Sequence, residues 1–162
     1  MPYHSLREFV DRLENENELV RIKDHVSPIL EITEITDRVS KQPGGGKALL
    51  FENVEGSNIP VLINAFGSSK RINMALGVRD IEKIPNDIDK YLKIKPPSSL
   101  LEKVKLLPML LEAAAFPPKM VSSRQASCQE VVLTGDDVDL GKIPILQCWP
   151  NDAGRFITFP IV

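Results

Sequence analysis

The sequence is poor in cysteine, carries no excess of basic charge and contains no long apolar run. Its two cysteines, Cys128 and Cys148, lack CxxC spacing and a histidine cluster, so no zinc site is indicated. The formal net charge of −2 argues against a nucleic-acid partner. No apolar stretch approaches the roughly 18 residues that span a membrane, and the first residues contain no apolar signal-peptide core. We therefore expect a cytoplasmic protein without a transmembrane segment.

Motifs for common catalytic chemistry are also missing. A disulfide between Cys128 and Cys148 stays open as an alternative, but the absence of an export signal favours two reduced, structural thiols. A catalytic cysteine is disfavoured because neither His4 nor His25 belongs to a recognisable partner motif. Ser-His-Asp, paired-carboxylate and metal-ligand spacings are absent as well. The residues alone therefore assign no catalytic or metal-binding site.

Two local patterns invite a functional interpretation, and both are better explained as connections. Asp136, Asp137 and Asp139 are the densest carboxylate group, and we interpret them as solvated acids of a turn. The one glycine-rich loop, residues 43–47, resembles a phosphate-binding loop in composition. It leads into the strand-like residues 48–51, whereas a phosphate loop leads into a helix N-terminus, so a helix-to-strand connection is favoured.

The first eighty residues predict alternating helices and strands. Apolar residues make up 43% and charged residues 26% of the chain, which is typical of a globular protein. Ser5 and Glu8 have the spacing of a capping box, which predicts a helix starting at Leu6. The predicted elements are a helix with the apolar face Leu6, Phe9, Val10 and Leu13, a strand over 18–22, a helix capped by Ser27 with Pro28 at its first position, strands over 48–51 and 61–63, and a helix from Ser68-Ser69 to Gly77.

The second half predicts a change of domain. Short helical segments over residues 80–92 precede an apolar helix over 100–116, whose broad apolar surface requires burial against the sheet or another chain. We place a domain boundary near residue 122, and residues 129–133 (QEVVL) predict the first strand after it. The order of elements predicts an α+β fold. Its first domain, residues 1–122, is α/β-like with a small mixed sheet, and residues 123–162 begin an incomplete antiparallel barrel.

Four stretches share the pattern of one known family, in the right order over essentially the whole chain. They are LREFVDRLENENELVRI from Leu6, LEITEITDRV from Leu30, ALLFENVEGSNIPVLINAFGS from Ala48, and the final set Asp139-Leu140, Ile143-Pro144, CWPNDAG from Cys148 and Phe156-Ile157-Thr158. On these residues the chain resembles the N-terminal part of the UbiD family, the decarboxylases that use prenylated flavin mononucleotide, among them 3-polyprenyl-4-hydroxybenzoate decarboxylase.

The resemblance implies a flavin held in a split β-barrel, with a divalent metal (Mn or Mg) and potassium bridging its phosphate and a Glu-Arg-Glu network beside it. The modified flavin accepts the electron pair left by loss of CO₂. Thr158 and Phe159 lie on the strand that lines the flavin pocket in the family, so they are the cofactor-binding candidates, with a solvent-facing or barrel-core position as the alternative. The family's metal ligands and catalytic residues lie beyond Val162, and Arg155 does not correspond to the catalytic arginine.

Two hypotheses for function follow. In the first, the chain is the N-terminal fragment of a decarboxylase that acts on a small aromatic or α,β-unsaturated acid. Quinone biosynthesis is the narrower setting of this hypothesis, and a flavin prenyltransferase would supply the cofactor. The strand-like residues 157–162 end without a turn or a partner, which favours this fragment hypothesis. The alternative is a non-enzymatic assembly or regulatory module. By itself, the 162-residue chain is expected to be inactive and to bind neither flavin nor metal.

Two further expectations concern packing. Trp149, the only tryptophan, is predicted to be buried at the junction of the two domains. The unpaired backbone of residues 156–162 and the apolar helix over 100–116 predict self-association, most simply as a two-fold dimer.

Overall fold

The computed structural model describes residues 3–93, 104, 107–108, 111, 120–122 and 126–157. The chain divides into two compact units, one formed by Met1–Glu82 with Asp139–Val162 and the other by Lys83–Val138. The domain boundary near residue 122 stays a prediction.

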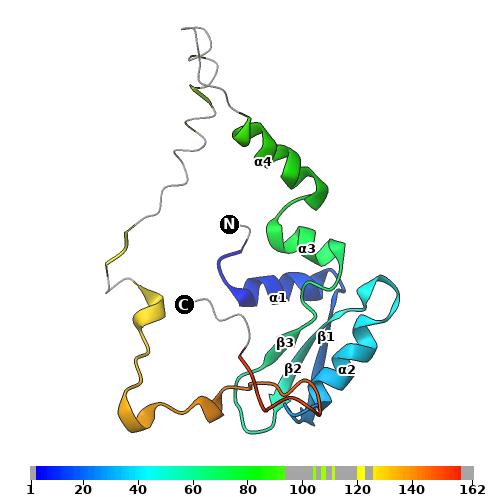
Figure 1. The fold of residues 1–162 in the computed structure, drawn as a ribbon, viewed down its shortest axis with the longest axis vertical. Helices are drawn as coiled ribbons and strands as arrows, with labels where there is room; N and C mark the ends of the chain where they lie inside the picture. Colours follow the sequence, from blue (N-terminus) through cyan, green and yellow to red (C-terminus); the bar gives the residue numbers. More distant parts are fainter. Residues whose placement is uncertain are drawn as a thin grey trace. The chain divides into compact units, whose positions relative to one another are not determined.

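The first unit is built on a three-stranded mixed sheet, as the sequence predicted. Its strands are β1 (Leu19–Val26), β2 (Ala48–Val54) and β3 (Val61–Ile63), in the order β1-β2-β3 (Figure 1). β1 and β2 run parallel and β2 and β3 antiparallel. The parallel pair requires a crossover, which α2 (Glu31–Ser40) supplies. Strand β1 extends four residues beyond the predicted strand.

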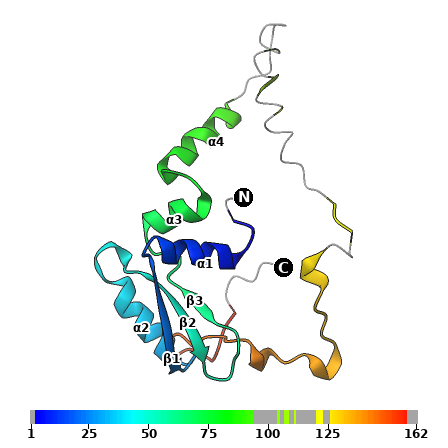
Figure 2. The same ribbon diagram turned by 180° about the vertical axis from the view of Figure 1, so that it is seen from behind.

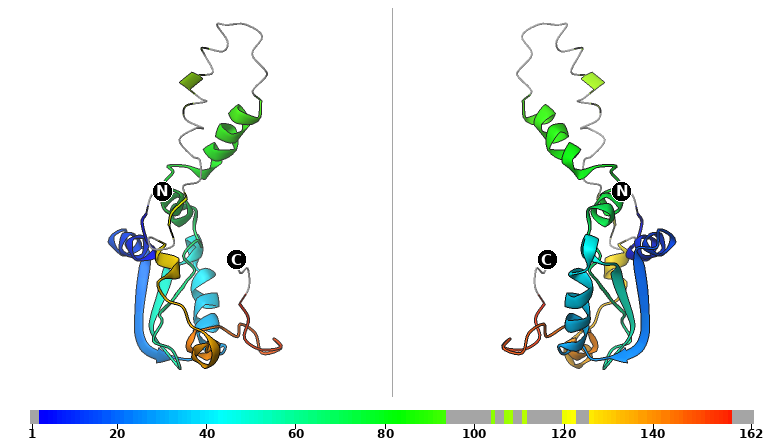
Figure 3. Two further views of the ribbon diagram at one scale, coloured as in Figure 1. Left: turned by 90° about the vertical axis from the view of Figure 1, so that its left-hand side faces the viewer. Right: turned by 90° about the vertical axis from the view of Figure 1, so that its right-hand side faces the viewer.

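The two faces of the sheet are covered by different helices, because alternate strand residues point to opposite sides. Leu50 of β2 packs with α1 (Leu6–Asn15), and its neighbours Leu49 and Phe51 pack with α2. Figures 2 and 3 show α1 and α2 on opposite sides of the sheet.

Helix α1 forms as the capping box predicted. The Ser5 hydroxyl accepts a hydrogen bond from Glu8 N at 3.2 Å, and the Glu8 carboxylate accepts one from His4 N at 2.7 Å. Of the predicted apolar face, Phe9, Val10 and Leu13 are buried. Leu6, at the start of the helix, is 66% exposed.

Helix α2 begins later than predicted, at Glu31, and without a side-chain cap. The backbone at Leu30 has φ +67° and ψ −38°, and Glu31 N donates to Ile29 O at 2.8 Å, which is the pattern of a γ-turn. Leu30 N also donates to Gln147 O at 2.9 Å, and Gln147 N donates to Pro28 O at 3.1 Å. Pairing with Gln147 therefore holds residues 28–30 in a non-helical turn, and the helix does not start at Pro28.

The last segment of the first unit, residues 139–157, packs back onto this γ-turn. It contains a 3₁₀ turn, η6 (Leu140–Lys142), and an isolated parallel bridge between Ile29 and Gln147. Phe156 N closes the segment on itself by donating to Leu146 O at 3.2 Å. Of the predicted strand over residues 157–162, only Ile157 lies within the described residues.

Helix α3 (Ser69–Leu76) follows β3 and ends as predicted, with Gly77 in the left-handed conformation. A 3₁₀ turn, η2 (Ile81–Lys83), leads to α4 (Ile84–Leu92), in which Pro85 stands at the helix start, where proline is tolerated.

In the second unit, the predicted strand over residues 129–133 is wrong. Gln129 instead closes the 3₁₀ turn η4 (Ser127–Gln129), and residues 130–133 form no strand. A second turn, η5 (Gly135–Asp137), follows. Most of the predicted helix over 100–116 lies outside the described residues. No helix within the described part of the chain is long and apolar enough to cross a membrane.

Candidate functional site

The acidic residues singled out in the sequence are turn residues in the structure, and the predicted cofactor residues are not among the residues that it describes. Thr158 and Phe159 lie outside the described residues. Asp136 and Asp137 are exposed in η5, and the Asp139 carboxylate accepts a hydrogen bond from Gly141 N at 2.8 Å. The interpretation of these acids as turn residues is therefore confirmed. The described residues contain no group of three or more His, Cys, Asp or Glu side chains that could hold a metal ion.

The glycine-rich loop forms a 3₁₀ turn, η1 (Pro43–Gly45), and leads into β2 as predicted. Carbonyl oxygens of this loop accept hydrogen bonds from side chains farther along the chain. Gly46 O accepts from Arg71 Nη1 at 2.6 Å, and Gly45 O accepts from Asn64 Nδ2 at 2.8 Å. A phosphate loop does the opposite, since it turns its N–H groups toward the anion. The loop therefore binds a guanidinium and an amide of the same chain.

Arg71 is fully buried on α3 and was not identified from the sequence. Its Nη1 lies 3.0 Å from Glu18 Oε2, and its Nε has no hydrogen-bond partner in the described structure. Burial disfavours the charged form of Glu18, but hydrogen bonds from Lys70 and Arg71 outweigh it, so the pKa of Glu18 is lowered. Arg71 stands three residues before Met74 and four before Ala75, which both pack against the core. This helical spacing is the signal in the sequence that could have placed Arg71 on the packed face of α3.

Trp149 is 58% exposed, so the prediction that it is buried is wrong. The turn that carries it is held by the Asp152 carboxylate, which accepts from Cys148 N at 3.2 Å and from Trp149 N at 2.8 Å. These bonds fix the backbone and leave the indole beside the surface of α2, where it borders a shallow pocket. Arg155 donates from Nε to Ile145 O at 2.7 Å and so braces the same segment.

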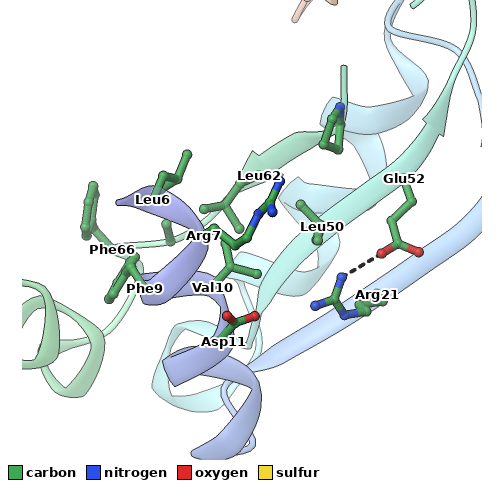
Figure 4. Close-up of a pocket in the computed structure, with 12 residues that line it drawn as sticks. Leu6, Arg7, Phe9, Val10, Asp11, Arg21, Leu50, Glu52, Leu62 and Phe66 are labelled. Atoms are coloured by element: carbon green, nitrogen blue, oxygen red, sulfur yellow. Dashed lines mark hydrogen bonds and ion pairs between the residues drawn. The ribbon is translucent and has the colours of Figure 1, made fainter. Parts of the chain in front are cut away.

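A pocket with a volume of about 760 Å³ lies on the α1 side of the sheet. Figure 4 shows α1 along one wall and β2 and β3 as the floor. Its apolar lining consists of Leu6, Phe9, Val10, Leu50, Pro60, Leu62, Ala65 and Phe66. The rings of Phe9 and Phe66 stack with their centroids 6.1 Å apart. This volume is within the range of about 300–1,000 Å³ that is typical of ligand pockets.

Charged side chains line the sheet end of the pocket. Arg21 of β1 pairs with Glu52 of β2 at 2.6 Å and with Glu14 of α1 at 2.8 Å. The hydrogen bond from Arg21 lowers the pKa of Glu14, and both carboxylates together raise the pKa of Arg21. Arg7 and Asp11, one helical turn apart on α1, also line the pocket, and the described structure gives neither side chain a partner.

Both cysteines are free thiols: Cys128 is exposed and Cys148 is half-buried. Neither belongs to a group of three or more His, Cys, Asp or Glu side chains that could hold a metal ion within the described residues. The favoured interpretation of two reduced thiols is consistent with this arrangement.

Comparison with known families gives two matches in sequence order. The family model "3-octaprenyl-4-hydroxybenzoate carboxy-lyase N-terminal domain" (UbiD_N) matches residues 10–91. The model "3-octaprenyl-4-hydroxybenzoate carboxy-lyase Rift-related domain" (UbiD) matches residues 119–162.

Among curated proteins, an uncharacterised protein of Aquifex aeolicus is 53% identical over 97% of the chain, and one of Archaeoglobus fulgidus is 48% identical over 100% of it. The chain spans about a third (32%) of the length of each of these relatives.

Two solved structures share the fold over 94% of this chain. One is an evolved dimeric form of the UbiD-class enzyme HmfF from Pelotomaculum thermopropionicum in complex with prFMN, 27% identical, with a TM-score of 0.64. The other is the closed form of the vanillic acid decarboxylase of Sedimentibacter hydroxybenzoicus, 25% identical, with a TM-score of 0.66. The matched regions are 30% and 29% of those chains.

Proposed function

The chain belongs to the UbiD family of carboxy-lyases, and from this we propose that it is the N-terminal part of a decarboxylase that removes CO₂ from an aromatic or α,β-unsaturated carboxylic acid. The observation that carries the proposal is the succession of two family matches along one chain, supported by the fold shared with UbiD-class enzymes. A role in quinone biosynthesis is the narrower form of the proposal.

The cofactor of the complete protein would be prenylated FMN with a divalent metal and potassium. The described residues do not fit the phosphate and metal end of such a group. They offer no cluster of metal-binding side chains, and the glycine-rich loop turns its carbonyls toward Arg71. We therefore assign the phosphate and metal sites to other parts of the complete protein, with Thr158 and Phe159 as the candidates in this chain for contact with the flavin.

The contribution of the described residues is then structural. The first unit forms a sheet with helices on both faces, and residues 139–157 are hydrogen-bonded to it through Gln147. This segment runs directly into Thr158 and Phe159 in the sequence. The first unit would therefore set the starting point of the strand that carries both flavin-contact candidates.

The proposal is tested on the longer protein that contains this chain, produced together with a flavin prenyltransferase. Loss of aromatic and α,β-unsaturated acids, and formation of the decarboxylated products, is followed by chromatography. Activity that depends on the prenylated cofactor supports the proposal. Absence of decarboxylation in a protein shown by its absorbance to carry the cofactor would favour the assembly or regulatory module instead.

The 162-residue chain serves as the matched control. It should be colourless and show no decarboxylation, because the metal and phosphate sites are assigned outside it. A flavin absorbance band that co-purifies with this chain at stoichiometric level would contradict that assignment.

A further inference from the structure

We propose that residues 139–157 form a strap that docks on the rest of the first unit and detaches as one piece, and that the start of α2 changes conformation as it does so. The structure shows the docked state, in which residues 28–30 form the γ-turn bonded to Gln147. In the undocked state, α2 extends back to Pro28. The inference does not depend on the proposed decarboxylase activity.

The two conformations compete for the same backbone groups. In the docked state, Pro28 O accepts a hydrogen bond from Gln147 N at 3.1 Å, and Leu30 N donates to Gln147 O at 2.9 Å. In a helix that starts at Pro28, this carbonyl accepts from Ile32 N, four residues later. Leu30 N then faces the Ser27 hydroxyl, as the third N–H of a capped helix does. One backbone cannot form the γ-turn and a helical turn together, so docking of the strap and extension of α2 exclude each other.

Contacts of an earlier helix start are already present in the docked state. The Ser27 hydroxyl accepts from Ile29 N at 3.3 Å, and the Glu31 carboxylate accepts from Ser27 N at 2.7 Å. Reciprocal bonds of this kind cap helix N-termini, and Pro28 stands where proline is favoured at a helix start. The local sequence therefore favours a helix from Pro28, and the bonds to Gln147 override that preference.

The backbone at Leu30 is strained while the strap is docked. Its φ of +67° is one that residues other than glycine rarely adopt. The two hydrogen bonds to Gln147 help to offset this cost. Leucine favours the α-helix, so loss of these bonds lets Leu30 relax into an extended α2. The strain therefore favours undocking.

The strap holds its own shape. Arg155 donates to the carbonyls of Ile143 and Ile145 at 3.2 and 2.7 Å, and Phe156 N donates to Leu146 O at 3.2 Å. All of these bonds lie within the strap, so they survive when it detaches. The strap therefore moves as a unit, in the manner of a cooperative local opening.

The attachment of the strap to the rest of the first unit is loose. Besides the bridge described above, Lys142 O accepts from the Ser57 hydroxyl at 2.8 Å, and Leu146 packs against the core cluster on the α2 side. The turn of Trp149 and helix α2 border a pocket of about 560 Å³. The Thr33 hydroxyl at this pocket is buried and has no hydrogen-bond partner in the described structure. Tightly packed contacts leave few such hollows and unpaired groups, so this contact is suited to opening.

Amide hydrogen exchange of the 162-residue chain, followed by NMR, tests the opening. The amides of Leu30 and Gln147 share one opening event, so their protection factors should agree within about threefold. Both should be at least about tenfold smaller than those of the central strand β2, which opens only with the whole unit. Amides at the bridge that are as protected as those of β2 would overturn the proposal.

A pair of variants at Gln147 tests the helix extension. Gln147→Pro removes the N–H that bonds Pro28 O, and Gln147→Ala, the matched control, keeps both main-chain bonds. Both variants lose the side-chain bond to Trp149 O at 3.4 Å. In Gln147→Pro, the Cα chemical shifts of residues 28–30 should move to helical values while the signals of β2 stay in place. In Gln147→Ala, neither set should change. Residues 28–30 that stay non-helical in the proline variant, or loss of its sheet signals, would contradict the switch.

A second pair of variants leaves Gln147 unchanged. Leu30→Gly and Leu30→Ala remove the same side chain, but glycine adopts positive φ readily whereas alanine favours the helix. The Gln147 amide should therefore be protected about tenfold or more better in the glycine variant than in the alanine variant. Equal protection in the two variants would overturn the proposal, because the backbone at Leu30 would then not oppose docking.

Discussion

Arg71 Nη1 lies 3.0 Å from Glu18 Oε2 and 2.6 Å from Gly46 O, so one buried guanidinium joins α3 to the residue before β1 and to the glycine-rich loop before β2. Charged groups rarely lie this deep without partners, because loss of hydration is costly. The pair therefore holds three segments that are distant in sequence in one arrangement.

Removal of this guanidinium should destabilise the first unit strongly. Arg71→Ala leaves a cavity and an unpaired acceptor at Gly46 O, and Glu18 keeps only Lys70 as a partner, so we expect a loss of about 3 kcal/mol in the free energy of unfolding by urea. Arg12→Ala removes an ion pair that is largely exposed and should cost less than about 1 kcal/mol. Equal effects of the two substitutions would contradict a structural role specific to Arg71.

The stability of the chain should fall in acid through Glu18. Burial raises the pKa of this carboxyl, but the hydrogen bonds from Lys70 and Arg71 dominate and hold it below the usual value of 4.5. A lowered pKa in the folded state means that the ionised form contributes stability above pH 4.5 and that this contribution disappears as the pH falls through the folded-state pKa.

Glu18→Gln measures that contribution. The difference in unfolding free energy between wild type and this variant should be constant at neutral pH and shrink as the pH falls below 4.5. A difference that stays constant down to about pH 2 would show that Glu18 is not stabilised in its ionised form.

Gly45 and Gly44 form a matched pair for a substitution test. Both have positive φ, +84° and +76°, so alanine at either position should cost about 1 kcal/mol of backbone strain. A Cβ at Gly45 would also overlap the carbonyl oxygen of Gly67, whereas a Cβ at Gly44 has no neighbour within 4 Å. Gly45→Ala should therefore lower the unfolding free energy by about 1–3 kcal/mol more than Gly44→Ala. Equal losses would show that the loop does not approach Gly67.

Trp149→Ala should change stability little, by less than about 1 kcal/mol, because the indole is 58% exposed. Phe51→Ala, in the fully buried core beside α2, should cost about 3–5 kcal/mol. Since Trp149 is the only tryptophan, its emission maximum in the wild-type chain provides an independent reading. A blue-shifted, quencher-resistant emission would contradict the exposed position.

Local signals in the sequence were sufficient for some elements. The capping box and the apolar spacing predicted α1, and Ser68 and Gly77 predicted both ends of α3. The start of α2 could not be predicted, because it depends on Gln147, far away in the chain. The predicted strand over residues 129–133 failed because Val131 and its neighbours find no pairing strand in the described structure.

The candidate site was less predictable than the fold. The pocket on the α1 side of the sheet combines residues from α1, β2 and the loop after β3, and no local pattern places Leu6 beside Phe66. The spacing of Arg71 from Met74 and Ala75 indicates the face of α3 on which it lies, but no local pattern identifies Glu18 and Gly46 O as its partners. Family resemblance identified the lineage, but the residues that it proposes for the flavin, Thr158 and Phe159, lie outside the described structure.

The γ-turn at Leu30 sets an order of events during synthesis of the chain. Its backbone conformation is one that side chains other than glycine rarely adopt, and the bonds to Gln147 help to hold it. A ribosome makes Gln147 long after β1, α2 and β2 have emerged, so the nascent chain can close its sheet while this turn is still unsupported. The arrival of residues 143–156 would then complete the first unit, and only afterwards would Thr158 and Phe159 follow from a fixed anchor.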